Sequence, residues 1–127
     1  MHEVGLLRSV SDAVEAAAQG SGASRVEAVG LRVGTLSGAV PEALHGAWPV
    51  ATAGTLLEGA RLDLEMVQAA VWCPRCETEQ PVDEFFALTC PVCGTPTANL
   101  VRGREFAVTW ADMADIGHDS DSGRRHD

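Results

Sequence analysis

Residues 73–94 read CPRCETEQPVDEFFALTCPVCG, and they contain all four cysteines of the chain. Cys73, Cys76, Cys90 and Cys93 form two CxxC pairs with thirteen residues between the pairs. A tight turn in each pair allows two sulfurs to reach one ion, and two such turns complete a tetrahedron. Four thiolates with no open position are typical of a structural zinc site. The stretch therefore predicts a zinc ribbon without indicating what the protein does.

Two other uses of the cysteines remain as alternatives. Two disulfides would need an oxidising compartment, but the chain does not begin with the basic and then apolar pattern of a secretory signal. A thioredoxin-like redox site needs one CxxC pair, whereas here two pairs match each other. Zinc is the favoured interpretation, and a closed four-thiolate site leaves no place for a catalytic water.

Composition limits the classes of partner. The chain has 127 residues, 18 acidic and 9 basic side chains, no lysine and a formal net charge of −9. Nucleic-acid binding needs clustered basic side chains, so this balance argues against a nucleic-acid partner. No apolar run is long enough to span a bilayer, which indicates a soluble protein without a membrane role. The absence of a secretory pattern predicts a cytoplasmic location.

Periodicity predicts the elements around the ribbon. Residues 4–19 should form an amphipathic helix, and residues 25–33 a strand. A second helix should begin at Pro41 and kink or end early at Pro49. Residues 60–71 and 104–113 should form two further strands, on either side of the ribbon. The apolar face expected of the first helix consists of Leu6, Leu7, Val10, Val14 and Ala17.

These elements predict an α+β fold in which two helices lie on a small three-stranded sheet, with the zinc ribbon inserted before the last strand. The predicted domains are an α/β domain from residues 1–71 and 100–116, and a ribbon domain of residues 72–99. Residues 117–127 are polar and are expected to form a disordered tail.

The first three residues suggest a second metal site. The Met1 amine, the His2 amide and the His2 ring can form adjoining chelate rings on one ion, and Glu3 can supply a fourth donor. Such planar nitrogen donors favour Ni(II) or Cu(II). A histidine also follows an initiating methionine by chance in many chains, so the spacing alone is weak support. His45, His118 and His126 are weaker candidates still.

The chain as a whole resembles the hydrogenase nickel-insertion accessory proteins, the HypA/HybF family of nickel metallochaperones. The resemblance rests on Met1-His2-Glu3, on the paired CxxC motifs and on three further segments in the family's order. Those segments are Val33-Gly34-Thr-Leu-Ser37, Gly54-Thr55-Leu-Leu-Glu58-Gly-Ala60-Arg-Leu62 and Gly103-Arg-Glu-Phe106.

The resemblance implies a nickel carrier and not an enzyme. It implies that Ni²⁺, the transported ion, is held by His2 with Glu3 and Met1, while structural Zn²⁺ is held by the four cysteines. The implied partners are a nickel-binding maturation GTPase, the large subunit of [NiFe]-hydrogenase and, in some organisms, the urease accessory system. A homodimer is left open. The alternatives are a zinc-ribbon interaction module without a nickel role, and a redox protein.

Overall fold

The computed structural model describes residues 2–114, and for His2 it gives only the place of that residue in a helix. The protein has an α+β fold with two helices and two three-stranded sheets, as predicted from the sequence. None of the described helices is long and apolar enough to cross a membrane. The elements in chain order are α1 (His2–Gly20), β1 (Arg25–Gly34), α2 (Pro41–Thr52), β2 (Arg61–Val67), β3 (Ala70–Cys73), β4 (Thr78–Pro81), β5 (Leu100–Arg102) and β6 (Phe106–Ala114).

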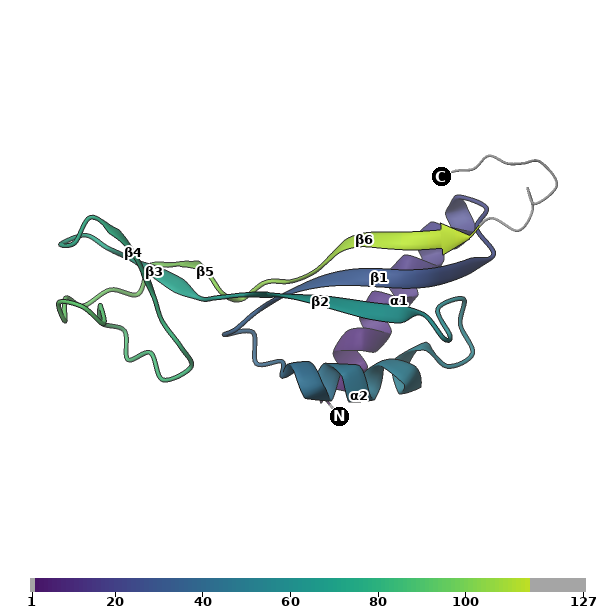
Figure 1. Cartoon of the computed structure of the whole chain (residues 1–127), viewed down its shortest axis with the longest axis horizontal. Helices are drawn as coiled ribbons and strands as arrows, with labels where there is room; N and C mark the ends of the chain where they lie inside the picture. Colours follow the sequence, from purple (N-terminus) through teal and green to yellow (C-terminus); the bar gives the residue numbers. More distant parts are fainter. Residues whose placement is uncertain (1, 115–127) are drawn as a thin grey trace. The chain divides into compact units, whose positions relative to one another are not determined.

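The first sheet has the strand order β2-β1-β6. Strands β1 and β2 run in the same direction and are joined through α2, whereas β6 runs in the opposite direction (Figure 1). Two backbone hydrogen bonds fix the antiparallel register, since Ser24 N donates to Ala114 O at 3.0 Å and Gly34 N donates to Glu105 O at 2.8 Å. Helices α1 and α2 pack against each other.

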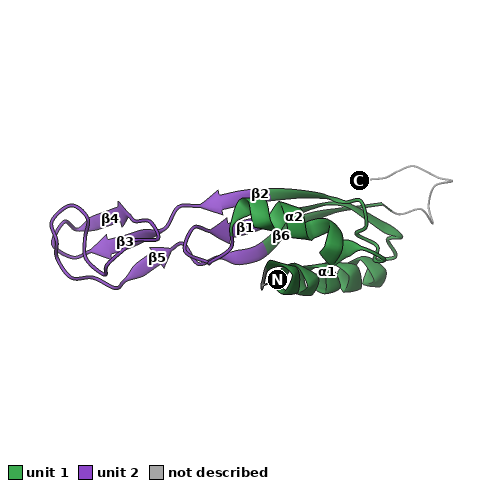
Figure 2. Ribbon diagram, turned by 90° about the horizontal axis from the view of Figure 1, so that it is seen from below, with its two compact units in different colours: residues 1–30, 40–63, 108–127 green, residues 31–39, 64–107 purple. Residues whose placement is uncertain are grey.

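The chain divides into two compact units (Figure 2). Unit 1 comprises residues 1–30, 40–63 and 108–127, and unit 2 comprises residues 31–39 and 64–107. This division follows compactness and does not test the functional domains predicted at 1–71 with 100–116 and at 72–99, which stay a prediction. The expected tail at 117–127 lies outside the described residues.

Helix α1 begins at His2, two residues earlier than predicted, and its buried face is shifted in phase. Leu7, Val10, Val14 and Ala18 are buried, whereas Ala17 is exposed. The prediction of Ala17 as a core residue was therefore wrong. Ala18 follows Val14 by four positions, which keeps it on the same side of a helix with 3.6 residues per turn.

Of the two effects predicted for Pro49, a kink or an early end of the helix, the early end was wrong, because α2 continues to Thr52. Proline lacks the N–H that an interior helical residue donates, so the continuation needs other support. Ala51 and Thr52 are buried, and the Thr52 hydroxyl donates to Trp48 O at 2.9 Å. Trp48 Nε1 in turn donates to Ala60 O at 2.8 Å. Packing and these bonds hold the last turn in place.

The strand predicted over residues 60–71 is two strands in the structure. Strand β2 ends at Val67, and β3 begins at Ala70 in the second sheet. Between them, Ala69 N donates to Thr35 Oγ1 at 2.9 Å, and Gln68 Nε2 donates to Val82 O at 2.6 Å. Side chains therefore supply two of the hydrogen bonds at this break, and the backbone supplies another, from Val82 N to Ala69 O at 3.0 Å.

Unit 2 contains a close backbone contact between segments far apart in sequence. A Cβ atom on Gly34 would lie 2.1 Å from both the carbonyl carbon and the oxygen of Gly103. Gly103 has φ 129°, and a Cβ there would lie 2.4 Å from Ala69 Cβ. Leu36 N also donates to Gly103 O at 2.7 Å. Only residues without a Cβ fit at Gly34 and Gly103.

The second sheet has the order β4-β3-β5, with β3 antiparallel to both neighbours. Its apolar core is small, which is typical of a fold that a metal must support. The core of the second sheet consists of buried Ala69, Val71 and Val82, with partly buried Leu36, Phe86 and Leu100 packed against it.

The last strand of the chain, predicted over 104–113, is β6 at Phe106–Ala114 and belongs to the first sheet.

Candidate metal centre

The two cysteine turns have the same backbone geometry. In the first, Glu77 N donates to Cys73 O at 2.8 Å, and in the second, Gly94 N donates to Cys90 O at 2.9 Å. The residue after each pair is left-handed, with φ 56° at Glu77 and 78° at Gly94. The turns thus present their sulfurs in the same way, from the end of β3 and from the loop after β4.

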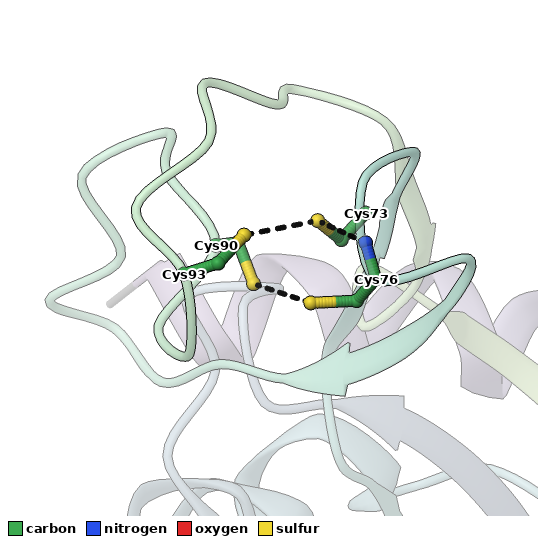
Figure 3. A group of neighbouring side chains, drawn as sticks. All are labelled: Cys73, Cys76, Cys90 and Cys93. Carbon is green, nitrogen blue, oxygen red and sulfur yellow. Dashed lines mark hydrogen bonds between the residues drawn. The ribbon is translucent and has the colours of Figure 1, made fainter.

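The four sulfur atoms form one cluster, which Figure 3 shows with the side chains directed toward one another. All four Sγ atoms lie within 4.8 Å of one another. Cys73 Sγ is 3.5 Å from Cys93 Sγ, and Cys76 Sγ is 3.9 Å from Cys90 Sγ. A tetrahedral ion with Zn–S bonds of about 2.3 Å separates its sulfurs by about 3.8 Å. The predicted quartet is therefore brought together at the spacing that zinc needs.

Hydrogen bonds surround the sulfurs. Cys76 N donates to Cys73 Sγ at 3.3 Å, and Val92 N donates to Cys90 Sγ at 3.4 Å. The Thr95 hydroxyl lies 3.1 Å from Cys93 Sγ. Amide and hydroxyl donors of this kind support thiolate ligands and hold them in place.

These contacts also shift the pKa values of two of the thiols in opposite directions. Hydrogen bonding from Thr95 lowers the pKa of the Cys93 thiol to about 6, while hydrogen bonding with Cys93 raises the pKa of the Cys76 thiol to about 12. Thr95 was not identified from the sequence. The signal available was a hydroxyl residue two positions after the last cysteine.

Burial of the cluster is uneven but leaves no catalytic opening. Cys73 and Cys90 are buried, Cys76 is half-buried and Cys93 is exposed. With four thiolates in a tetrahedron, no position remains for a substrate or an activated water. The donor set and spacing suit structural zinc, because soft sulfur ligands in this geometry are those of zinc ribbons.

The predicted nickel ligands lie at the start of α1. His2 and Glu3 are in the first helical turn, Glu3 is half-buried, and Met1 lies outside the described residues. Glu3 belongs to unit 1, whereas the cysteines belong to unit 2. His45 is exposed on α2, and the two tail histidines lie outside the described part. Among the described side chains, those of residues 3–114, the cysteine quartet is the group that could hold an ion by itself.

Known proteins of one family are similar to this chain over nearly its whole length. The sequence profile of the family described as "Hydrogenase/urease nickel incorporation, metallochaperone, hypA" matches residues 1–113. "Hydrogenase maturation factor HypA" of Roseiflexus sp. (strain RS-1) is 40% identical over 115 residues, which cover 91% of this chain and 94% of that protein. The protein of the same name from Streptomyces avermitilis is 41% identical over 116 residues, covering 88% of each.

Two solved structures share the fold. One, "Solution structure of HypA protein", matches with a TM-score of 0.63 at 20% identity, covering 91% of this chain and 98% of that one. The other, the Ni metallochaperone HypA from Helicobacter pylori, matches with a TM-score of 0.54 at 18% identity, covering 84% and 96%. These two structures are similar in fold, while the profile match and the relatives of about 40% identity show that the chain belongs to the HypA family of hydrogenase and urease nickel-incorporation metallochaperones.

Proposed function

We propose that this protein binds Ni²⁺ at its N-terminus and delivers it for the maturation of [NiFe]-hydrogenase. The observation that carries the proposal is the family match over residues 1–113, which includes both Met1-His2-Glu3 and the cysteine ribbon. Relatives of about 40% identity are named hydrogenase maturation factors. The protein is not an enzyme in this proposal, because its chemistry is the binding and release of an ion.

Helix geometry is consistent with a terminal nickel site. His2 and Glu3 stand in the first turn of α1, where the N–H groups point out of the end of the helix. The positive end of the helix dipole also favours a deprotonated amide and the Glu3 carboxylate. The Met1 amine, the His2 amide and the His2 ring would then supply nitrogen donors to the cargo ion. Such a site can release nickel when a partner replaces the donors one at a time.

The zinc site has a different role in this proposal. Cys73, Cys76, Cys90 and Cys93 hold a resident Zn²⁺ that stabilises the ribbon, residues 72–99, while residues 1–71 and 100–116 form the nickel-binding domain. The partners are a nickel-binding maturation GTPase and the hydrogenase large subunit, with urease accessory proteins and a homodimer as further candidates. The proposed location is the cytoplasm, where the target enzymes would be assembled.

Nickel titration of untagged, zinc-loaded protein by calorimetry tests the terminal site. We expect His2→Ala to abolish tight binding, and a short extension before Met1 to weaken it strongly because the amine is displaced. His45→Ala is the matched control, since it removes an exposed histidine of unit 1 and should bind nickel as the parent does. Lowering the pH should release nickel, because a protonated imidazole cannot coordinate. Unchanged binding in both the His2 variant and the extended chain would overturn the proposal.

The alternative is a zinc-ribbon interaction module in which Met1-His2-Glu3 is accidental. It predicts one tightly held zinc per chain and no tight nickel binding. Cys73→Ser distinguishes the two sites, because it should lose zinc while the N-terminus still binds nickel. A redox protein would instead show thiols that cycle between states and no stoichiometric zinc.

A further inference from the structure

A groove lies on the ribbon part of unit 2. Its volume is about 450 Å³, and its walls come from the end of β4 and the loop that follows. Pockets of about 300–1,000 Å³ accommodate ligands or side chains from a partner. The residues that line it include Gln68, Val82, Asp83, Phe85, Phe86 and Pro91.

Large apolar side chains are exposed along the segment that lines this groove: Phe85 lines it, and Leu88 and Val92 adjoin lining residues in sequence. Phe85 is 81% exposed, Leu88 57% and Val92 70%. The neighbouring Phe86 packs against the ribbon core, so the ribbon does not need Phe85 for its own stability. A cluster of exposed apolar side chains around a groove marks an interaction site more often than an ordinary surface.

The backbone keeps Leu88 in an unfavourable conformation at this surface. Leu88 has φ 66°, a left-handed value that is unfavourable for a residue with a Cβ. Its carbonyl accepts a hydrogen bond from Thr97 N at 2.9 Å, which fixes the loop. Such conformations cluster at ligand clamps and active sites, although turns such as the one at Glu77 also adopt them.

The charge around the groove has one sign. Between Arg75 and Arg102 the sequence has four acidic residues and no basic residue. Glu79 pairs with Arg102. Glu77, Asp83 and Glu84 have no cationic partner among the described residues, and the Asp83 carboxylate accepts a hydrogen bond from Phe85 N at 2.9 Å. The segment that forms most of the groove therefore combines exposed apolar side chains with acidic ones, and Asp83 lines the groove itself.

We propose that this groove docks a segment of a partner protein in which an apolar side chain lies next to Lys or Arg. The apolar side chain would enter the groove beside Phe85 and Leu88, and the basic side chain would meet Asp83 and Glu84. Charged rims of this type steer association and select partners, while buried apolar anchors supply most of the affinity. The proposal concerns the ribbon surface and does not depend on where nickel binds.

A random twelve-residue peptide library, displayed on phage and selected against zinc-loaded full chain, tests this. We expect the enriched peptides to place Lys or Arg within one or two positions of an aromatic or aliphatic residue. Amide shifts in ¹⁵N-labelled protein should concentrate in residues 81–92 when such a peptide, made synthetically, is added. Failure to enrich any peptide, enrichment of acidic ones, or shifts confined to other parts of the chain would overturn the proposal.

Variants then separate the roles within the surface. Phe85→Ser should weaken binding of the selected peptide by about tenfold or more, as expected of a central apolar contact. Leu88→Gly should also weaken binding of the peptide. Because glycine suits the left-handed backbone, this variant removes the side chain while preserving the fold. Glu84→Gln should weaken binding and reduce its dependence on salt. Val50→Ser removes an exposed apolar side chain of α2 and should change nothing.

Self-association is the competing occupant of the groove. Sedimentation of the zinc-loaded chain over a range of concentrations measures it directly. A dimer that dissociates in Phe85→Ser would show that a second copy covers the groove and would overturn the proposal, whereas a chain that stays monomeric supports it.

Discussion

Replacing Gly34 by alanine should destabilise the protein strongly, because the new methyl group has no room. A Cβ there would lie 2.1 Å from the carbonyl carbon and oxygen of Gly103 and 2.6 Å from Arg104 N. Favourable carbon contacts are about 3.5–4.0 Å, so the two backbone segments would have to separate by more than about 1 Å. All three obstructing atoms belong to the backbone, so no side-chain rotation can relieve the clash.

The cost follows from what this separation breaks. Two hydrogen bonds hold the segments together, from Gly34 N to Glu105 O and from Leu36 N to Gly103 O. Each contributes about 0.5–1.5 kcal/mol. Overpacking strain adds about 1–3 kcal/mol, and alanine recovers about 0.5–1 kcal/mol of glycine's entropic disadvantage in a strand. We expect Gly34→Ala to lower the free energy of unfolding by about 3 kcal/mol, measured by urea denaturation of zinc-loaded protein with far-UV circular dichroism.

Gly46→Ala is the matched control. Gly46 lies in α2, where nothing stands within 4 Å of a new Cβ, so alanine should stabilise the helix by about 0.5–1 kcal/mol. A loss below about 1 kcal/mol in Gly34→Ala, with normal zinc content, would refute the reasoning, because it would mean that the two backbone segments can part at little cost.

Three further substitutions test other parts of the molecule. In Gly30→Ala the new methyl would lie 2.1 Å from Nε1 of the half-exposed Trp110 ring, which can swing outward. The loss should be about 1–2 kcal/mol and should disappear in a Trp110→Ala background, as a double-mutant cycle by denaturation would show. Ser11→Ala removes a buried hydroxyl that has no hydrogen-bond partner among the described residues, and should raise the unfolding free energy by about 1 kcal/mol. Arg61→Gln should raise the pKa of Asp63, which a hydrogen bond from Arg61 lowers, as followed by NMR titration. The lowered pKa of Asp63 stabilises the folded state above the unfolded pKa, and this stabilisation is lost as pH falls through the folded pKa. The variant should therefore be less stable than the parent near neutral pH, and its stability should depend less on acid.

The cysteine cluster was predictable from sequence because its spacing carries the geometry. A CxxC pair specifies a turn, and two pairs specify four convergent sulfurs whatever the rest of the fold does. Thr95 was not predictable in the same way, since its hydroxyl reaches Cys93 only after the second turn has formed. The role of Met1-His2-Glu3 depends on chelation at the terminus, and it stays a prediction.

The fold was predictable where the alternating pattern of a segment stayed within a single sheet. Alternation predicted β1, β2 and β6 to within a few residues. It did not reveal the break at residues 68–69, because Ala69, Ala70 and Val71 are apolar and follow β2 directly in the sequence, although they are more buried than most of β2. Apolar continuity therefore concealed a change of sheet. The short strands β4 and β5 gave no alternation at all, since they exist only through pairing with β3.

The positions of the four cysteines have a consequence for the surface that lies between them. The thirteen-residue segment from Glu77 to Thr89 carries most of the groove, and both of its ends are attached to the cysteine cluster. An ion bound there closes a loop, and loop closure removes conformational entropy from the segment before any partner arrives. A chain without zinc would have to bear that entropic cost during docking. A zinc-loaded copy should therefore bind the proposed partner more tightly than a copy without zinc, because its groove is already ordered.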